Sequence, residues 1–432
     1  MDLQIIQQYT EVLHEELVLS LGCTEPASIA YAAALARATL GFMPESIHVA
    51  CSGNIIKNVK TVIVPNSGNQ KGVEAAAILG TLSGNHEKKL EVLEDITEED
   101  INTSRELYKA NFCTVELLKD VPDLHIIITA KGGGHVVLVE LAKGHTNVTR
   151  LEKDNIPLQT QAQEIVEESY QDRSFMTVKG ILEFAEVCSI ETVKEILDRQ
   201  IDCNTHIAEE GFNGTYGANV GRNLILSRGN DFRTRAKASA AAGSDARMSG
   251  CKLPVVINSG SGNQGMTVSL PVIEYAKELH VSQDKLYRAL IISNLIAIHQ
   301  KTRIGKLSAY CGAVSAACGS GAAITWLCDG DYKQISDTIT NTLANVSGIV
   351  CDGAKPSCAA KIASSVDAAI LGHDLAMQSK SFHCGDGIVK SDVETTIDSI
   401  GRLARVGMRS TDTEVLQIML EKNQIGEMPK VV

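Results

Sequence analysis

Three cysteines each stand just before a predicted helix, a position where a thiol can do chemistry. Cys23 lies in "LGCTEPASIAYAAALAR", Cys311 in "AYCGAVSAACGSGAA" and Cys351 in "IVCDGAKPSCAAKIASS". The unpaired amides of a helix N-terminus stabilise an anion, so they favour the thiolate. Three thiolates can hold three irons of a [4Fe–4S] cluster and leave the fourth iron open as a Lewis acid. Spacing alone does not establish a cluster, because the chain has no C-x-x-C motif and buried cysteines also act as small apolar side chains.

A second feature suits an anionic ligand. The tetrapeptide Ser-Gly-Asn-Gln occurs twice, at Ser67, Gly68, Asn69 and Gln70 and at Ser261, Gly262, Asn263 and Gln264. Each copy follows an apolar segment typical of a strand and precedes a predicted helix. A glycine-rich turn in that context exposes backbone amides that can hold a carboxylate. Neither copy has the phosphate-loop pattern, so a nucleotide is the weaker interpretation, and two ordinary tight turns are the alternative.

Two lysines are candidate bases because of their place in the sequence. Lys306 lies shortly before Cys311, and Lys355 shortly after Cys351. Burial beside a metal centre lowers the pKa of a lysine toward the range where it can accept a proton. A solvated or carboxylate-paired lysine is the alternative at both positions.

Three further residues are weaker candidates for the site, His135 and Cys358 as bases and Arg222 for substrate binding. His135 follows three glycines in "KGGGHVV", where a hairpin turn is the commoner outcome. Cys358 follows Cys351, but a glycine and a proline between them interrupt any helix that would align the two, so we expect it behind the site. Arg222 can pair bidentately with a carboxylate and lies in the glycine-rich segment 211–223, which is either a flap or a connector.

The elements that position these residues change in character along the chain. Residues 1–43 predict two helices, the second with Thr24 as N-cap and Pro26 in its first turn. Short Val-, Ile- and Thr-rich segments predict strands. They lie at 46–53, 59–66, 89–94, 112–119, 124–132, 135–144, 146–154 and 254–258. The remainder after about residue 155 is helical in pattern. We therefore expect an α+β fold, with a mainly helical catalytic unit (1–85 and 155–432) and an inserted sheet-rich module (86–154).

The composition bounds the class of protein. The length of 432 residues favours two compact units. With 44% hydrophobic residues, only 4% aromatic residues and 35 glycines, the interior must pack small side chains closely. The net charge of −12 disfavours nucleic acid and anionic lipid as partners.

The cysteine content is informative together with the expected location. The beginning of the chain is unlike a signal peptide and no apolar stretch reaches the roughly 20 residues that span a membrane, so we expect a cytoplasmic protein without a membrane partner. Because the cytosol keeps thiols reduced, twelve cysteines indicate thiol, metal or redox chemistry. Cys113, Cys188, Cys203 and Cys328 are expected to be small buried hydrophobes.

Four segments together resemble the L-cysteine desulfidase family, whose catalytic unit is related to the alpha chain of the iron–sulfur L-serine dehydratases. They are "LGCTEPASIAYAAALA", "SGNQG", "KLSAYCGAVSAACG" and "IVCDGAKPSCAAKIA", and the resemblance spans essentially the whole chain. It implies an oxygen-sensitive [4Fe–4S] cluster on Cys23, Cys311 and Cys351. It also implies β-elimination of L-cysteine to pyruvate, ammonia and hydrogen sulfide, with the Ser-Gly-Asn-Gln turns on the substrate carboxylate.

Other functions stay open at this point. L-Serine ammonia-lyase is the nearest, although the regulatory domain common in serine dehydratases is not evident. A non-enzymatic iron–sulfur sensor would need no carboxylate site. A pyridoxal-phosphate lyase would need a phosphate-binding cup beside a lysine, which the sequence does not offer. We also expect the protein to be a homodimer.

Overall fold

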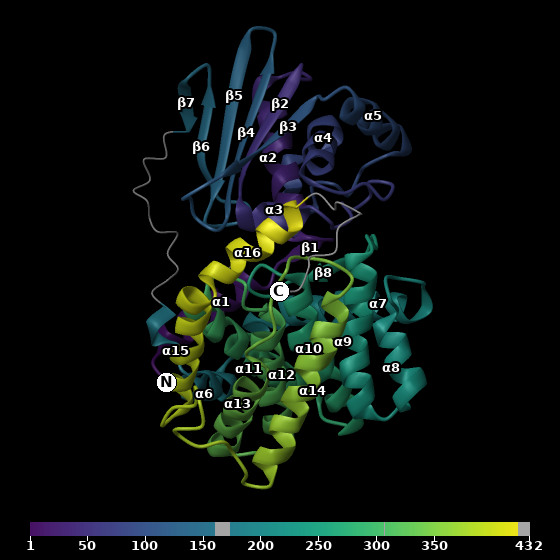
Figure 1. Ribbon diagram of the computed structural model, residues 1–432. Coiled ribbons are helices and arrows are strands. Elements are labelled where there is room, and N and C mark those ends of the chain that lie inside the picture. Colours follow the sequence, from purple (N-terminus) through teal and green to yellow (C-terminus); the bar gives the residue numbers. More distant parts are fainter. Residues whose placement is uncertain (160–172, 306, 422–432) are drawn as a thin grey trace, which may run out of the picture.

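Two units share the chain, one built on a β-sheet and the other from helices (Figure 1). The computed structural model describes residues 1–159, 173–305 and 307–421. Within these ranges many helices accompany one six-stranded sheet and one two-stranded sheet, which confirms the predicted α+β class.

The six-stranded sheet has the order β3-β2-β4-β5-β6-β7. β2 and β3 are parallel, and the other neighbouring pairs in this sheet are antiparallel. Ile126, Ile128 and Ala130 are buried and alternate with less buried residues, the pattern of a strand with one face on a core. Helices α2 and α4 cover that face. The elements of this unit are α2 (Thr24–Leu40), β2 (Ser46–Ser52), α3 (Gly53–Val59), α4 (Val73–Ser83), α5 (Glu98–Lys109), β3 (Cys113–Leu118), β4 (His125–Gly132), β5 (His135–Ala142), β6 (Val148–Lys153) and β7 (Ile156–Gln159).

Two predicted strands have a different structure. Residues 59–66 form a single bridge, between Ile63 and Lys71. Residues 89–94 lie partly in a 3₁₀ helix (His86–Glu91) and partly after it. Most apolar side chains of both segments are nevertheless buried. A short apolar run therefore marks burial without specifying the backbone conformation.

The predicted boundary at residue 86 falls inside the sheet unit. β2 lies within the sheet, and α2, β2 and α4 share a hydrophobic core with β4 and β5. Residues 156–159, expected to belong to the helical unit, form the edge strand β7. The sheet unit therefore runs from about residue 24 to residue 159.

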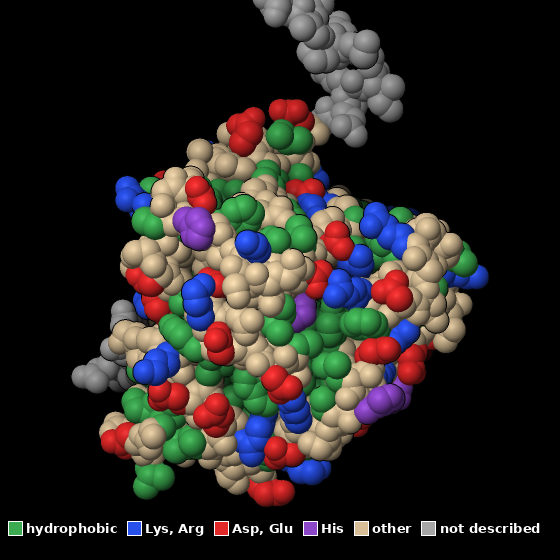
Figure 2. All heavy atoms as spheres, turned by 90° about the horizontal axis from the view of Figure 1, so that it is seen from below, with side chains coloured by type: hydrophobic (Ala, Val, Ile, Leu, Met, Phe, Trp, Pro, Cys, Tyr) green, Lys and Arg blue, Asp and Glu red, His purple; other side chains and the backbone are tan. Residues whose placement is uncertain are grey.

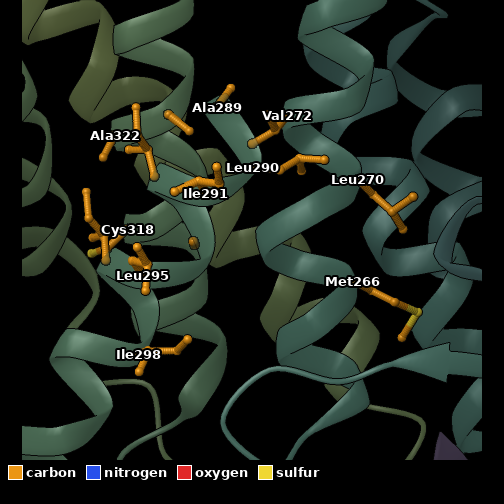
Figure 3. Close-up of a cluster of buried hydrophobic side chains, with 14 of the residues drawn as sticks. Met266, Leu270, Val272, Ala289, Leu290, Ile291, Leu295, Ile298, Cys318 and Ala322 are labelled. Carbon is orange, nitrogen blue, oxygen red and sulfur yellow. The ribbon is translucent and has the colours of Figure 1, made fainter. Parts of the chain in front are cut away.

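Helices α10, α11 and α12 contribute to one hydrophobic core at the centre of the helical unit, and Figure 3 shows some of their buried apolar side chains. A Cβ at Gly319 of α12 would overlap the Ser293 carbonyl oxygen of α11, so glycine lets the two helices approach closely. This is the small-residue packing that the composition predicts. The unit contains α1 (Leu3–Glu16), α6 (Val178–Val187), α7 (Lys194–Asn213), α8 (Val220–Arg228), α9 (Phe232–Met248), α10 (Gly262–Glu278), α11 (Gln283–Ile304), α12 (Gly312–Leu327), α13 (Tyr332–Val346), α14 (Cys358–Met377), α15 (Val393–Arg402) and α16 (Arg409–Leu420).

A short pairing of strands brings the beginning of α2 onto the helical unit. β1 (Leu19–Leu21) pairs antiparallel with β8 (Pro254–Val256), and the Ile257 amide donates to the Val18 carbonyl at 2.9 Å. The N-cap of α2 is Cys23, whose backbone is extended, and Thr24 is the first helical residue; the prediction of Thr24 as N-cap was one residue too late. The pairing therefore fixes the Cys23 thiol beside the turn that follows β8.

The described surface mixes charges of both signs. Ion pairs within helices, such as Lys194 with Asp198, contribute to this mixing. On the lower face of the helical unit, Figure 2 shows basic and acidic side chains interspersed. Among the described residues, none of the helices has both the length and the apolar character that a membrane span requires.

Asp245 of α9 is a fully buried carboxyl group that holds the first turn of α8. Its Oδ2 accepts from the Gly221 amide at 3.0 Å, whereas no described group hydrogen-bonds to its Oδ1. Burial raises the pKa of Asp245 to about 6, although hydrogen bonds from Gly221 and Val220 lower it. Since the folded pKa lies above the unfolded value of about 4, ionisation of Asp245 destabilises the fold as pH rises from about 4 to about 6.

Asp245→Asn is therefore expected to stabilise the protein at neutral and alkaline pH. Asparagine keeps an acceptor for the Gly221 amide and removes the buried charge. The expected gain is about 2 to 3 kcal/mol near about pH 8 and close to zero near about pH 4. Thermal unfolding at the two pH values measures it, and an equal gain at both would contradict the assignment of the effect to this carboxylate.

Candidate functional site

Cys23, Cys311 and Cys351 line one cavity of about 100 Å³ where the two units meet. Cys23 and Cys311 are the N-cap residues of α2 and α12, so two of the thiols stand at helix N-termini. Cys351 lies in the loop before α14. The Cys311 amide donates to the Ile349 carbonyl at 3.1 Å and the Cys351 amide to the Ala309 carbonyl at 2.6 Å. These two bonds hold the second and third cysteines side by side.

Burial opposes ionisation of these thiols. Cys23 is 2% exposed and Cys311 is 8% exposed. Burial raises the pKa of both, that of Cys311 to about 12. The expected stabilisation of the thiolate by helix amides is thus outweighed by lost solvation. A bound cation would reverse the balance, since thiolates ligate metals in their deprotonated form.

The donor set fits a cluster better than a single ion. In the described part of the chain, no three His, Cys, Asp or Glu side chains are grouped so as to hold one metal ion. A [4Fe–4S] cluster does not require the three thiols to converge on one metal ion, because each cysteine binds a different iron. Cys358 in the first turn of α14 lines the same cavity, and its thiol donates to the Gly353 carbonyl at 3.6 Å.

The other groups around the cavity are polar and mostly basic. The lining holds Lys57, His145, Arg247, Lys301 and Lys361 with one acid, Glu25. Two of the lysines already pair with acids outside the lining, Lys57 with Asp412 and Lys361 with Asp352. Several lining polar atoms are buried without a described hydrogen-bond partner: Asn58 Oδ1, His145 Nε2, Asn263 Oδ1 and Gln264 Oε1. Buried polar groups are normally paired with protein, water or ligand, and the three amide oxygens among these atoms require a hydrogen-bond donor. Pockets for drug-sized ligands measure roughly 300–1,000 Å³, so a group bound here would be compact.

Glu25 organises one wall of the cavity. Its Oε2 accepts from the Cys23 thiol at 3.2 Å, and its Oε1 accepts from Asn58 Nδ2 at 3.0 Å. His145 Nε2 lies 3.9 Å away, which is an ion-pair distance. Burial by itself raises the pKa of Glu25. The interactions with His145 and Cys23 outweigh this effect and lower the pKa to about 2. Glu25 is therefore an ionised acceptor that orients the Cys23 sulfur.

The second Ser-Gly-Asn-Gln turn lies in this cavity. Ser261 is the N-cap of α10 and accepts from the Gln264 amide at 3.5 Å. Gly262 allows the Arg247 guanidinium to lie against the turn, because a Cβ there would overlap it. Asn263 and Gln264 follow in the first turn of the helix and line the cavity. The predicted turn before a helix is confirmed for this copy.

The first copy is a closed turn outside the cavity lining. Ser67 Oγ accepts from the Gln70 amide at 2.9 Å, and Gln70 Nε2 donates to the Ser67 carbonyl and to Ser104. Gly68 packs against α5, and Asn69 has a left-handed backbone. No full strand precedes this copy and α4 begins only at Val73, so its polar groups pair within the sheet unit. The two copies do not converge on one pocket.

Most other predicted residues also lie outside the lining. Lys355 pairs with a neighbouring aspartate at 3.3 Å. His135, half-exposed in the β4–β5 hairpin, lies 2.7 Å from Asp154. Arg222 is exposed on α8. Lys306 is outside the described residues.

Lys301 is the lysine that the structure places in the cavity instead. It lies in the last turn of α11 and is buried. Burial lowers the pKa of Lys301 to about 8, although Cys351 and Cys311 raise it. An amine that is partly neutral near working pH can accept a proton. The sequence carries no clear signal for its burial, because the helix before Lys301 mixes apolar residues with polar ones such as Asn294, His299 and Gln300.

Comparisons with known proteins show what the chain is similar to. The sequence model of a family described as serine dehydratase alpha chain matches residues 87–417, which include Cys311 and Cys351 and begin after Cys23. A UPF0597 protein of Lachnoclostridium phytofermentans is 56% identical over 410 residues, covering 95% of this chain and 98% of its own. UPF0597 proteins of Desulfitobacterium hafniense and Treponema denticola are each 50% identical, over 417 and 423 residues, covering 96% of this chain and 97% and 98% of their own.

Proposed function

Because the chain belongs to the serine dehydratase alpha chain family, we propose that it is an iron–sulfur lyase that eliminates the β-substituent of a small L-amino acid. L-Cysteine, which with water gives pyruvate, ammonia and hydrogen sulfide, is the first candidate substrate. L-Serine, which gives pyruvate and ammonia, is the second and is favoured by the family description. The observation that carries the proposal is that three cysteines from distant segments share one cavity rich in basic side chains.

Cys23, Cys311 and Cys351 are the residues that would hold the cluster. When bound, a [4Fe–4S] cluster with three cysteine ligands supplies a Lewis acid at its remaining iron. In the protein without a cluster, the Cys23 thiol donates to Glu25, and this proton would leave when Cys23 binds iron as a thiolate.

The remaining lining residues would bind the substrate and remove its α-proton. Arg247 supplies a planar cation for the α-carboxylate, together with the amides at the N-terminus of α10. The unpaired oxygens of Asn263 and Gln264 suit the α-ammonium group. Lys301 takes the α-proton first; the bond from Cβ to sulfur or oxygen then breaks, and its electrons leave with that atom. The aminoacrylate that results takes up water outside the protein's control to give pyruvate and ammonia.

The test is kinetic and analytical on protein purified without oxygen. We expect about four irons per chain and visible cluster absorbance. The ratio of kcat/KM for L-cysteine and L-serine decides the substrate. Full activity in iron-free protein would contradict the proposal, and an aldimine absorbance would favour a pyridoxal-phosphate enzyme. A loaded cluster without turnover of either amino acid would favour a sensor.

Asn263→Ala is expected to lower kcat/KM while leaving the iron content unchanged. The variant removes one partner of the substrate, a loss of about 1 to 3 kcal/mol, or roughly 5-fold to over 100-fold in kcat/KM. Asn69→Ala in the first copy is the matched control; it lowers thermal stability slightly, since alanine fits the left-handed conformation less well, but leaves kcat/KM unchanged. Similar losses in both variants would mean that the two copies act together after all.

A further inference from the structure

Lys57 is a buried cation of the sheet unit whose partner comes from the last helix of the helical unit, α16. It lies in α3, is 1% exposed and lines the cavity. Its Nζ lies 3.5 Å from the Cys351 carbonyl oxygen, to which it donates, and it forms an ion pair with Asp412 of α16. A buried ammonium requires a counter-ion, so the position of Lys57 depends on Asp412.

The helix that carries Asp412, α16, lies on the surface of the protein. No residue of α16 is buried, and in Figure 1 the helix runs over the junction of the two units and ends on α3. Two further contacts hold it there. Lys60 Nζ donates to the Met419 carbonyl, and Leu416 occupies the space beside Gly53, where a Cβ would come within 2.7 Å of it.

We propose that Asp412 is a positioning residue for the cavity: it holds Lys57 against the Cys351 carbonyl, so that α16 completes the site. Its role in turnover rests on the proposed function, whereas the placement of Lys57 can be tested without it. Lys57, held in this way, presents positive charge to the wall that also carries Arg247 and Lys301. The groups it serves are anionic, the substrate carboxylate or a thiolate-bound cluster.

A purely structural role for the pair is the alternative, and matched variants separate the two. Asp412→Asn removes the charge with little change of shape, and Asp412→Glu restores it. Leu416→Ala removes an apolar contact of α16 with Gly53 and keeps both charged side chains of the ion pair. Glu414→Gln removes a carboxylate from an exposed position of the same helix.

The first readout is amine modification of Lys57, followed by mass spectrometry of the full-length protein. Asp412→Asn should increase the rate at Lys57 by roughly 10-fold, the factor expected from loss of a charged hydrogen bond, whereas Glu414→Gln and Asp412→Glu should stay near the wild-type rate. Unchanged protection of Lys57 in Asp412→Asn would overturn the proposal, whatever reaction the protein catalyses.

The second readout is the division of the effect between KM and stability. Asp412→Asn should raise KM for the amino acid by roughly 10-fold, or lower the iron content if Lys57 serves the cluster. Leu416→Ala should lower the melting temperature and leave KM and iron content unchanged. Equal changes of KM in Asp412→Asn and Leu416→Ala would show that α16 is only a structural support and would overturn the positioning role.

Discussion

Alanine at Cys23, Cys311 or Cys351 is expected to abolish turnover and to lower the iron content of anaerobically prepared protein. The three thiols come from α2, α12 and the loop before α14, and they share one cavity. Each would hold a different iron, so no remaining cysteine takes over for the one removed. The loss should exceed the roughly 10- to 100-fold that follows loss of a residue behind a metal ligand. Iron analysis, visible absorbance and rate measure it.

Two further cysteines serve as controls for this experiment. Cys113 is buried in β3 within the core of the sheet unit, so Cys113→Ala should keep its iron and its rate. Cys358 lines the cavity, but its thiol already donates to the Gly353 carbonyl. Cys358→Ala should therefore retain iron and lose only part of its activity. Normal turnover in any variant of the first three cysteines would remove that residue from the ligand set.

The parts of the site that could be predicted are those with a local signal. A cysteine directly before an alanine-rich run marks a helix N-terminus, and the structure has Cys23 and Cys311 as N-caps. The Gly-Asn-Gln sequence after β8 likewise starts α10 where expected. Helix starts depend on a few consecutive residues, so the chain itself carries the information.

The residues that were missed come together through tertiary structure. Lys57 and His145 belong to the sheet unit, and Lys301 ends a helix of the other unit, yet all line one cavity. No spacing in the sequence relates them. The echo of Ser67–Gln70 with Ser261–Gln264 was misleading for the same reason: identical tetrapeptides meet different neighbours, and only the second faces the cavity. The predicted boundary at residue 86 differs from the observed beginning of the sheet unit, because β2 pairs with strands that follow much later in the chain.

Lys301→Met is expected to lower kcat by about 100- to 10,000-fold, the range over which a positioned base contributes. Methionine is unbranched and apolar and is one atom shorter than lysine, so it suits the buried site, and the fold and the iron content should be kept. The neutral amine is the active form of a base. Because burial lowers the pKa of Lys301 to about 8, wild-type kcat/KM should rise as pH increases through that region, and the variant should lose this rise.

Exchange of the α-proton with deuterated solvent tests the same assignment without the later steps. Wild-type protein should exchange the Cα proton of bound substrate, and Lys301→Met should not. Lys355→Met is the matched control, since Lys355 pairs with an aspartate outside the cavity lining and should exchange normally. Lys306→Met tests the other lysine that the sequence predicts as a base. Loss of exchange in Lys306→Met, with exchange retained in Lys301→Met, would identify Lys306 as the base. The low pKa of Lys301 would then be a consequence of packing alone.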